Sequence, residues 1–488
     1  MESPNVLLVV LDTARAKTVL PEMEDGHMPE LRSISGEGVT FTGATTTGPW
    51  TVPSHASLFT GQYTSDHGTH GGDPRFASEV PSLASRLGAD GYRTAGLSAN
   101  SWVSPEFGFD EGFDSFSMKW ERVWSDVDLM PIYDEDTVPD RLRALADVLT
   151  ARNAPRTLLN AFYAKFLAGR HDDGARNETR RAVKWIRERA GDERPFFLFV
   201  NYIEPHLEYD PPETYRRQVL ESDQRERAEE VNQDPWEYVA GDAHMDEEDF
   251  EVLERLYRGE LRYVDDQIGR LYDVLDETGQ LEDTVIVIVG DHGENVGDHG
   301  LMDHQYCLYE TLLRVPLVVR YPDRFGAGTT CGGPVEVRDL YPTILDLAGV
   351  DVPSDETVSD HSLVPDDGGV PTRDHAIAEY VTPQPSMDAL REKVESFRTE
   401  TTRFDRALRS IRTETWKLIE GSDGSVELYD LASDPDEGVD VSSDHESVVA
   451  DLRSELEASR GPLTRGATGE VCMTDQSKRR LEDLGYLQ

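Results

Sequence analysis

Lysine is scarce in this chain, and so is positive charge altogether. Its 488 residues include 7 lysines and 41 arginines, which face 95 aspartates and glutamates and leave a formal charge of -47 at pH 7. Charge of this sign repels nucleic-acid phosphates and anionic membrane surfaces, so we expect neither nucleic acid nor membrane as a partner. The acid-rich, lysine-poor composition indicates a halophilic, salt-adapted surface, with an ordinary acidic cytosolic protein as the alternative.

Cysteine is also rare in this chain. Cys307, Cys331 and Cys472 lie far apart and show neither a metal-binding spacing nor a disulfide framework, which favours a reducing compartment. No apolar run approaches the ~20 residues needed to span a bilayer. The first residues are not basic and lead directly into an apolar strand, so we expect no signal peptide and a soluble, cytoplasmic protein.

Short apolar runs are what the chain does contain. Four of them have the unbroken character of strands that are covered on both faces. These runs lie at residues 5–11, 195–203, 284–289 and 315–320. Helical periodicity is clearest over residues 177–190 and 250–275. Strands that alternate with helices predict a doubly wound α/β core.

The pattern changes near residue 386. We predict a catalytic domain over residues 1–385 and a smaller C-terminal α+β subdomain over residues 386–488. Short strands are expected in the subdomain around residues 412–420 and 426–431. Within the larger domain, residues 118–171 are irregular, charged and aromatic-bearing, and we expect them to form a lid or wall over a site.

The most informative stretch runs from Gly48 to Gly61. Thr51 stands just before Pro53-Ser54, a pair that can open a helix, because proline loses nothing in the first turn. The free N–H groups of a helix N-terminus favour negative charge, so a hydroxyl held there can have a lowered pKa and act as a nucleophile. The alternative is that Thr51 is only an N-cap.

Three of the predicted strands end in residues that can do chemistry. These ends are Asp12, Glu204-Pro205-His206 and Asp291-His292. Ligands of open α/β sheets gather at the carboxyl ends of strands. Asp12, Asp291 and His292, with the Thr51 oxygen, make a divalent-metal set, in which the imidazole favours a zinc- or manganese-like ion.

A cation in that set would lower the pKa of the Thr51 hydroxyl and neutralise an oxyanion. His206 or His304, across the site, could then protonate the leaving oxygen. Each of these histidines also has a plainer interpretation as a loop residue packed near the site. A second metal ion is conceivable if Glu204, His206 and His304 gather.

Several further motifs occur in a fixed order along the chain. They are the opening strand with Asp12 and Arg15, the T-x-P-S-H-x-S-L-F-T-G stretch at residues 51–61, residues 91–95, Glu204-Pro205-His206, residues 291–300, residues 339–343 and residues 428–431. On these motifs the chain resembles the sulfatase family of the alkaline phosphatase superfamily. The resemblance covers nearly the whole chain. It implies an α/β/α sandwich with a smaller C-terminal domain, and ester hydrolysis at a metal-bound nucleophile.

The chain departs from that family at the nucleophile and at the substrate-gripping cations. Sulfatases of the usual type carry Cys or Ser at the position of Thr51 and convert it to formylglycine. Threonine has an extra methyl on Cβ, so its oxidation cannot give that aldehyde, and we expect no formylglycine. His55 stands where the family has arginine, and His304 where it has lysine.

By position, the resemblance groups His55 with the catalytic residues Thr51, His206 and His304. The stretch around Asn100 replaces a Gly-Lys-Trp-His segment of the family. By the same resemblance, Asn100 and Arg15 are expected to bind the substrate.

Members of the wider superfamily that use unmodified serine or threonine include phosphatases, phosphodiesterases and phosphonate hydrolases. The leading hypothesis is therefore a metal-dependent hydrolase of sulfuric or phosphoric esters, with calcium, manganese or zinc and a small-molecule or glycan ester as substrate. Because the resemblance associates an unmodified threonine with phosphoryl chemistry, Thr51 slightly favours phosphorus esters over sulfur esters. Two alternatives stay open: a phosphoglycerol- or phosphoethanolamine-type transferase, and an inactive sulfatase-like binding protein.

Overall fold

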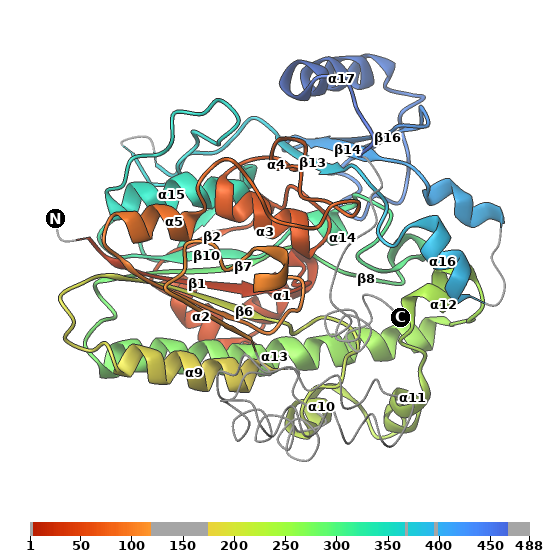
Figure 1. The fold of residues 1–488 in the computed structure, drawn as a ribbon. Coiled ribbons are helices and arrows are strands. Elements are labelled where there is room, and N and C mark those ends of the chain that lie inside the picture. The colour runs from red at the N-terminus through yellow and green to blue at the C-terminus, as the bar shows by residue number, and fades with distance from the viewer. Residues whose placement is uncertain (1–2, 119–173, 367–368, 395–398, 467–488) are drawn as a thin grey trace, which may run out of the picture.

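The computed structural model describes residues 3–118, 174–366, 369–394 and 399–466 (Figure 1). The lid predicted at residues 118–171 therefore lies, except for Met118, outside the described residues. So does the end of the predicted C-terminal subdomain, from residue 467 onward.

An eight-stranded sheet forms the centre of the molecule. Its strands, in spatial order, are β11 (Thr329–Cys331), β2 (Val39–Phe41), β10 (Leu317–Arg320), β7 (Thr284–Gly290), β1 (Asn5–Leu11), β6 (Phe196–Tyr202), β4 (Arg93–Ser98) and β5 (Ser115–Met118). β1 is parallel to both of its neighbours, β6 and β7. β10 runs antiparallel to β7 and to β2. The four predicted apolar runs are thus β1, β6, β7 and β10.

Helices cover both faces of this sheet. Side chains alternate between the faces along a strand, so Val6, Leu8 and Val10 of β1 enter one apolar core while Leu7, Val9 and Leu11 enter a second. Over the first core lie α3 (Thr51–Thr60), α5 (Leu83–Ala89) and α15 (Leu340–Ala348). Over the second lie α1 (Ala16–Glu24), α2 (Pro29–Gly36), α9 (Ala175–Arg187) and α13 (Glu247–Glu277) (Figure 1). The architecture is the expected α/β/α sandwich.

α13 is the longest described helix. Its first turn is fixed by a reciprocal cap, because the Asp246 side chain accepts from Asp249 N and the Asp249 side chain accepts from Asp246 N. No helix of the described residues combines the length and the apolar character that crossing a membrane requires.

The shorter helices are α4 (Thr64–His67), α10 (Glu213–Val219), α11 (Gln224–Glu230), α12 (Pro235–Ala240), α14 (Glu310–Leu313) and α16 (Met387–Lys393). Two small strand pairs are β3 (Ala44–Thr45) with β12 (Val335–Glu336), and β8 (Asn295–Val296) with β9 (Met302–Asp303).

A second, antiparallel sheet lies toward the C-terminus. Its strands are β13 (Ala376–Tyr380), β14 (Leu408–Arg412), β15 (Trp416–Gly421) and β16 (Val426–Asp430), and α17 (Glu446–Arg460) packs on it. Residues 412–420, expected as one strand, include the end of β14, a turn and most of β15. β13 precedes residue 386, so this sheet takes an edge strand from the other side of the predicted domain boundary, which stays a prediction.

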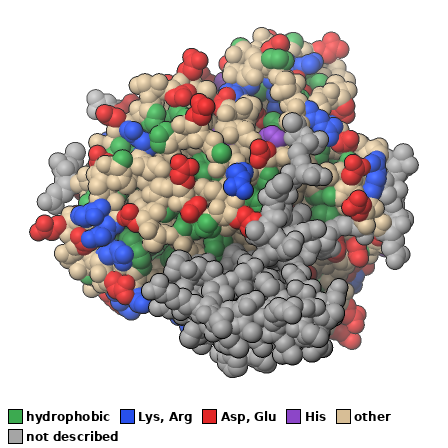
Figure 2. Space-filling view, viewed as in Figure 1, with side chains coloured by type: hydrophobic (Ala, Val, Ile, Leu, Met, Phe, Trp, Pro, Cys, Tyr) green, Lys and Arg blue, Asp and Glu red, His purple; other side chains and the backbone are tan. Residues whose placement is uncertain are grey.

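Acidic side chains are spread across the molecular surface that Figure 2 presents, and basic side chains form smaller groups among them. This agrees with the charge of -47. Adaptation to high salt stays a prediction.

Candidate active site

The site lies where β1 and β7 end side by side. Leu11 pairs with Gly290 at the last position of the two parallel strands, so Asp12 and Asp291 follow at the same edge of the sheet. Both carboxylates are fully buried. The expected meeting of two strand ends is therefore found in the structure.

Thr51 is the first residue of α3, and the N-cap is Trp50. Thr51 Oγ1 lies 3.3 Å from His292 Nε2 and 3.5 Å from Asn100 Nδ2. α3 closes at Gly61 in the left-handed conformation, with φ of 73°. The hydroxyl of Thr51 thus faces the side chains of the strand ends at the start of a short, well-bounded helix.

His292 presents one ring nitrogen to the two carboxylates. Its Nδ1 donates to the Gly293 carbonyl at 2.9 Å, so Nε2 carries the lone pair. Nε2 lies 3.5 Å from Asp12 Oδ1 and 3.5 Å from Asp291 Oδ2. Asn100 Nδ2 donates to Asp12 Oδ2, which places Asn100 at the same group.

These residues fit a divalent cation. Asp291 Oδ1 accepts from the backbone N–H groups of Thr13 (3.2 Å) and His292 (2.8 Å), whereas its buried Oδ2 accepts no hydrogen bond from the described residues. Burial, and next the Asp12 carboxylate, raise the pKa of Asp291 well above its ordinary value. Two buried carboxylates beside an imidazole lone pair and a hydroxyl are costly without positive charge, and they match the donor set of a metal site.

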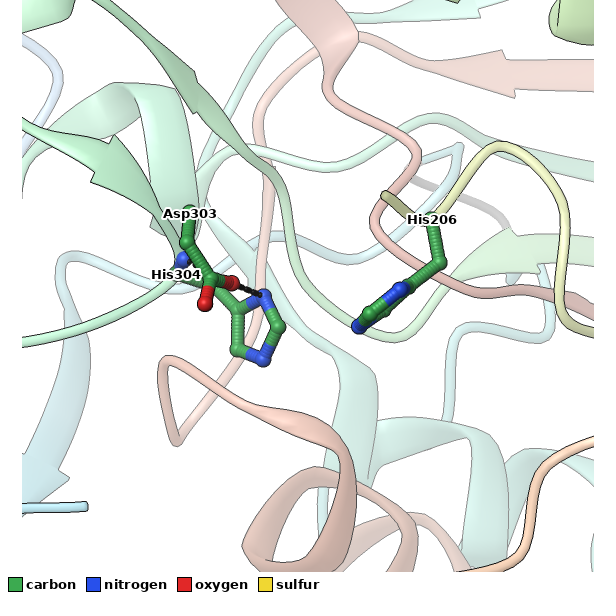
Figure 3. Close-up of side chains that lie close together, drawn as sticks. All are labelled: His206, Asp303 and His304. Atoms are coloured by element: carbon green, nitrogen blue, oxygen red, sulfur yellow. Dashed lines mark hydrogen bonds and ion pairs between the residues drawn. The ribbon is translucent and has the colours of Figure 1, made fainter. Parts of the chain in front are cut away.

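A second buried group adjoins the first (Figure 3). It consists of His206, Asp303 and His304, each of which offers a ligand atom within 4.8 Å of the others. The ring centroids of His206 and His304 are 5.3 Å apart, and those of His304 and His292 are 4.5 Å apart. His304 Nδ1 donates to Asp303, and although burial opposes it, this carboxylate raises the pKa of His304 well above its ordinary value.

Glu204 is not part of the second group as the structure arranges it. Its Oε1 accepts from Ala175 N at 3.0 Å, at the first residue of α9. Asp303 stands beside the two histidines instead. The set considered from the sequence, Glu204 with His206 and His304, is therefore replaced by Asp303 with the same histidines.

His55 lies behind Thr51. Its Nδ1 donates to the Thr51 carbonyl at 2.9 Å and lies 3.5 Å from Asp291 Oδ2, and its ring meets Phe59, Phe109 and Phe199 edge-on. Burial lowers the pKa of His55 to about 4, so its imidazole is neutral and does not replace the charge of an arginine.

Arg15 is not brought to this group. Its guanidinium pairs with Glu254 of α13 and with Asp298 at 2.8 Å, and Nη1 also donates to the Glu294 carbonyl at 3.2 Å. The side chain is only 2% exposed. Its donors contact Glu254 and residues 294–298, and its expected role in substrate binding stays a prediction.

Sequence reasoning missed two acidic residues of the site, Asp303 and Glu294. Glu294 is fully buried, and its Oε1 lies 3.8 Å from His304 Nδ1. Burial raises the pKa of Glu294 to about 7, against the opposing effect of His304. The available signal was the pair Asp303-His304, which repeats the Asp291-His292 pair 12 residues later in the chain.

Comparison with known proteins agrees with this arrangement. Residues 4–350 match the Sulfatase family, and residues 297–461 match the family described as N-sulphoglucosamine sulphohydrolase, C-terminal. Arylsulfatase K from Bos taurus is 24% identical over 485 residues, which cover 93% of this chain and 81% of that protein. Choline-sulfatase from Rhizobium meliloti (strain 1021) is 25% identical over 458 residues, which cover 88% of this chain and 81% of that protein.

The fold is shared with solved structures. The phosphonate monoester hydrolase of Agrobacterium radiobacter superposes with a TM-score of 0.67 at 22% sequence identity, over 94% of this chain and 95% of that one. This likeness confirms the fold. Together with the family match over most of the chain, it confirms the resemblance drawn from the motifs: the chain is an ester hydrolase that belongs to the sulfatase family of the alkaline phosphatase superfamily.

Proposed function

We propose that this chain hydrolyses sulfate, phosphate or phosphonate esters with the unmodified hydroxyl of Thr51 as the nucleophile. The observation that carries the proposal is the position of Thr51 Oγ1, 3.3 Å from His292 Nε2 and beside two buried carboxylates at the start of α3. A hydroxyl that merely capped the helix would turn toward the backbone N–H groups of its first turn. The likeness in fold to a phosphonate monoester hydrolase supports the inclusion of phosphorus esters.

A divalent cation, either calcium, manganese or zinc, would be held by Asp12, Asp291, His292 and the Thr51 oxygen. Bound there, it supplies the positive charge that lowers the pKa of the hydroxyl and offsets the charge of the ester. The protein's own part is to fix the ligands. Backbone N–H groups of Thr13 and His292 hold Asp291, and the Gly293 carbonyl fixes the tautomer of His292.

The reaction has two displacements. The Thr51 oxygen forms a bond to sulfur or phosphorus while the bond to the leaving oxygen breaks, and the departing oxygen takes a proton from the His206–His304 pair. A water molecule then attacks the ester on Thr51, and the Thr51 oxygen leaves and regains its proton. Threonine cannot be oxidised to formylglycine because it bears a methyl group on Cβ, and this route needs only its hydroxyl.

Phosphorus is the favoured centre. The family's arginine and lysine positions are occupied here by His55 and His304, and Arg15 is bound to Glu254 and Asp298. Among phosphorus esters, a singly charged phosphodiester or phosphonate monoester suits this set of side chains better than a doubly charged phosphate monoester, because few cationic side chains of the described residues are present to offset the second charge. The substrate is a small-molecule or glycan ester, in line with the relatives named arylsulfatase and choline-sulfatase.

The test compares aryl sulfate, aryl phosphate, phosphodiester and aryl phosphonate substrates in molar KCl with manganese, zinc or calcium. The variants are Thr51→Ala and, as a matched control on the same helix, Ser57→Ala, whose hydroxyl contacts His67. We expect Thr51→Ala to lower kcat/KM by at least about 10³-fold while Ser57→Ala stays close to wild type. Equal activity of Thr51→Ala and wild type would refute the nucleophile.

Two further readouts separate the alternatives. Product formation that requires an added alcohol acceptor would identify a transferase. Wild type that binds the cation and turns over none of the four esters would favour the binding protein.

A further inference from the structure

We infer that Tyr306 is a positioning residue that holds His304 where it serves the reaction. The inference rests on the proposed function, in which the His206–His304 pair supplies the proton to the leaving oxygen. Tyr306 lies two residues after His304 and is only 2% exposed. It belongs to the loop of residues 297–306, which carries the Asp303-His304 pair.

The backbone of this loop is strained. Within the described residues, five residues other than glycine have a positive φ, and three of them lie in this loop: His299 at 55°, Asp303 at 69° and Tyr306 at 65°. Histidine and aspartate tolerate the left-handed region comparatively well, whereas a bulky residue such as tyrosine rarely adopts it. Such a conformation costs free energy and persists only where the surrounding structure holds it. Tyr306 must therefore be held from outside the loop.

Tyr306 is held by a segment that comes much later in the chain. Its hydroxyl donates to the Pro385 carbonyl at 3.0 Å. Its ring stacks on that of Phe404, with centroids 5.1 Å apart and 20° between the ring planes. Pro385 directly precedes Ser386, whose side chain caps the first turn of α16 by accepting from Ala389 N at 3.2 Å. We call the contacts of Tyr306 with Pro385 and Phe404 the clamp.

The clamp lies in a small apolar cluster that is separate from the two cores of the central sheet. Its eight buried members come from the loop and the residues just after it, from α12, from α16 and from the chain after α16. They are Leu301, Tyr306, Cys307, Leu312, Trp236, Met387, Leu390 and Phe404. α12 also contacts β9 and α16, and Figure 1 shows the two helices next to each other. Two distant parts of the chain thus close on the loop and restrain its strained backbone.

The clamp fixes His304 because only one residue separates His304 from Tyr306. On the other side of His304, Asn295 Nδ2 donates to the Asp303 carbonyl at 2.9 Å, and the Asp303 side chain accepts from His304 N at 2.6 Å. Figure 3 shows the ring of His206 pointing toward the His304 ring that is held in this way. Loss of the clamp lets the loop relax and moves His304 relative to the leaving oxygen. A displacement of about 1 Å can lower a rate by about 10²-fold.

Two measurements on the full chain test the inference, one of the loop and one of the chemistry. Hydrogen–deuterium exchange with mass spectrometry reports how often the backbone of residues 297–306 opens. Leaving-group dependence reports the proton donor, because 4-nitrophenolate leaves without a proton, whereas ethanol from the ethyl ester of the same acid must take one. The variants are Phe404→Ala, the milder Tyr306→Phe and His304→Gln. Phe325→Ala is the matched control, because buried Phe325 follows β10 at the edge of the sheet opposite the site.

We expect faster exchange of residues 297–306 in Phe404→Ala and Tyr306→Phe, but not in Phe325→Ala. Phe404→Ala should lower kcat/KM for the ethyl ester by about 10-fold or more and for the 4-nitrophenyl ester by less than about 3-fold, which is a smaller form of the bias expected in His304→Gln. Tyr306→Phe should show the same pattern more weakly, and it keeps the ring stack in case Phe404→Ala fails to fold.

Unchanged exchange in both clamp variants would overturn the inference. So would an equal loss on the two esters in Phe404→Ala, if His304→Gln shows the bias. If His304→Gln lacks the bias, the proton donor of the proposed function is wrong, and the exchange result alone decides whether Tyr306 holds the loop.

Discussion

Buried carboxylates occur in two regions of the molecule, in opposite surroundings. At the junction with the C-terminal sheet, Glu310 pairs with Arg412 at 3.1 Å and with Lys417 at 3.1 Å, and Lys417 also pairs with Glu437 at 2.8 Å. At the site, Asp291 has Asp12, His55 and His292 as its neighbours.

The pKa values differ accordingly. Burial alone would raise the pKa of Glu310, but Lys417 and Arg412 outweigh it and lower the pKa to about 2. Burial and Asp12 raise the pKa of Asp291, since no lysine or arginine pairs with it among the described residues. A buried carboxylate that pairs with a lysine or arginine of the same chain stabilises the fold. A buried carboxylate without such a pair is a candidate ligand for a cation taken up from solution.

The largest expected effect is on stability at the junction. Lys417→Met leaves Glu310 and Glu437 buried with reduced compensation, so the free energy of unfolding should fall by about 3–5 kcal/mol. Lys184→Met is the matched control, because Lys184 is 77% exposed and only loosely paired with Glu188. Urea unfolding at constant KCl measures both. A loss no larger in Lys417→Met than in Lys184→Met would contradict the structural role of the network.

The complementary change is at the site. Asp291→Asn removes one proposed cation ligand and one of two adjacent buried negative charges, so kcat/KM should fall by about 10²–10³-fold while the cation-free protein keeps its stability. Asp339→Asn is the contrasting variant, because the buried Asp339 carboxylate already has a cationic partner in the chain, Arg373, at 2.5 Å. It should lose stability and keep its activity per folded molecule. If Asp291→Asn failed to fold, Asp291 would stabilise the structure as Glu310 does, and the contrast between the site and the junction would be wrong.

Removal of the cation should have a smaller effect than either change. A ligand present at 100 times its Kd stabilises the folded state by about 2.7 kcal/mol, and chelation should remove that amount from wild type. The raised folded-state pKa of Asp291 means that the cation-free protein loses stability as the pH rises through that pKa, so the effect should grow with pH. Thermal unfolding with and without chelator measures it, and Asp291→Asn should respond least.

The regular part of the fold could be predicted because its signals are local. The apolar runs of β1 and β7 and the helical period of α13 are present in the sequence itself, and the strand ends that they define bring Asp12 beside Asp291. The pairing of β2 with β10 and β11 had no such signal, because β2 has three residues and its partners lie more than 270 residues away.

The site was predictable only where a strand ended in it. Asp303 follows no long apolar run, since β9 has two residues, so only the repeated Asp-His pair marked its carboxylate. Arg15 was expected to bind substrate because it belongs to the opening motif of the family resemblance, yet its partner Glu254 lies on α13, 239 residues away. Contacts that form between distant segments decide such roles, and periodicity does not encode them.

The smallest predicted effect concerns a third kind of buried acid, Asp265 on α13. It accepts the backbone N–H groups of Glu30 (3.0 Å) and Leu31 (2.8 Å) at the start of α2, yet burial outweighs these bonds and raises its pKa to about 7. A raised pKa alone therefore does not identify a cation site, because Asp265 lies among scaffold helices with backbone donors as its partners.

Since the folded pKa of Asp265 exceeds the value of about 3.9 for an unfolded aspartate, its contribution to stability is complete below pH 4 and is lost as the pH rises through 7. Asp265→Asn removes this titration, so the stability of wild type relative to the variant should fall by about 1 kcal/mol between pH 6 and pH 7. Asp276→Asn, at an exposed position of the same helix, is the control. Urea unfolding across this range should show wild type and Asp276→Asn running parallel while Asp265→Asn diverges. If all three run parallel, Asp265 does not titrate in this window, and burial among the scaffold helices does not raise its pKa to about 7.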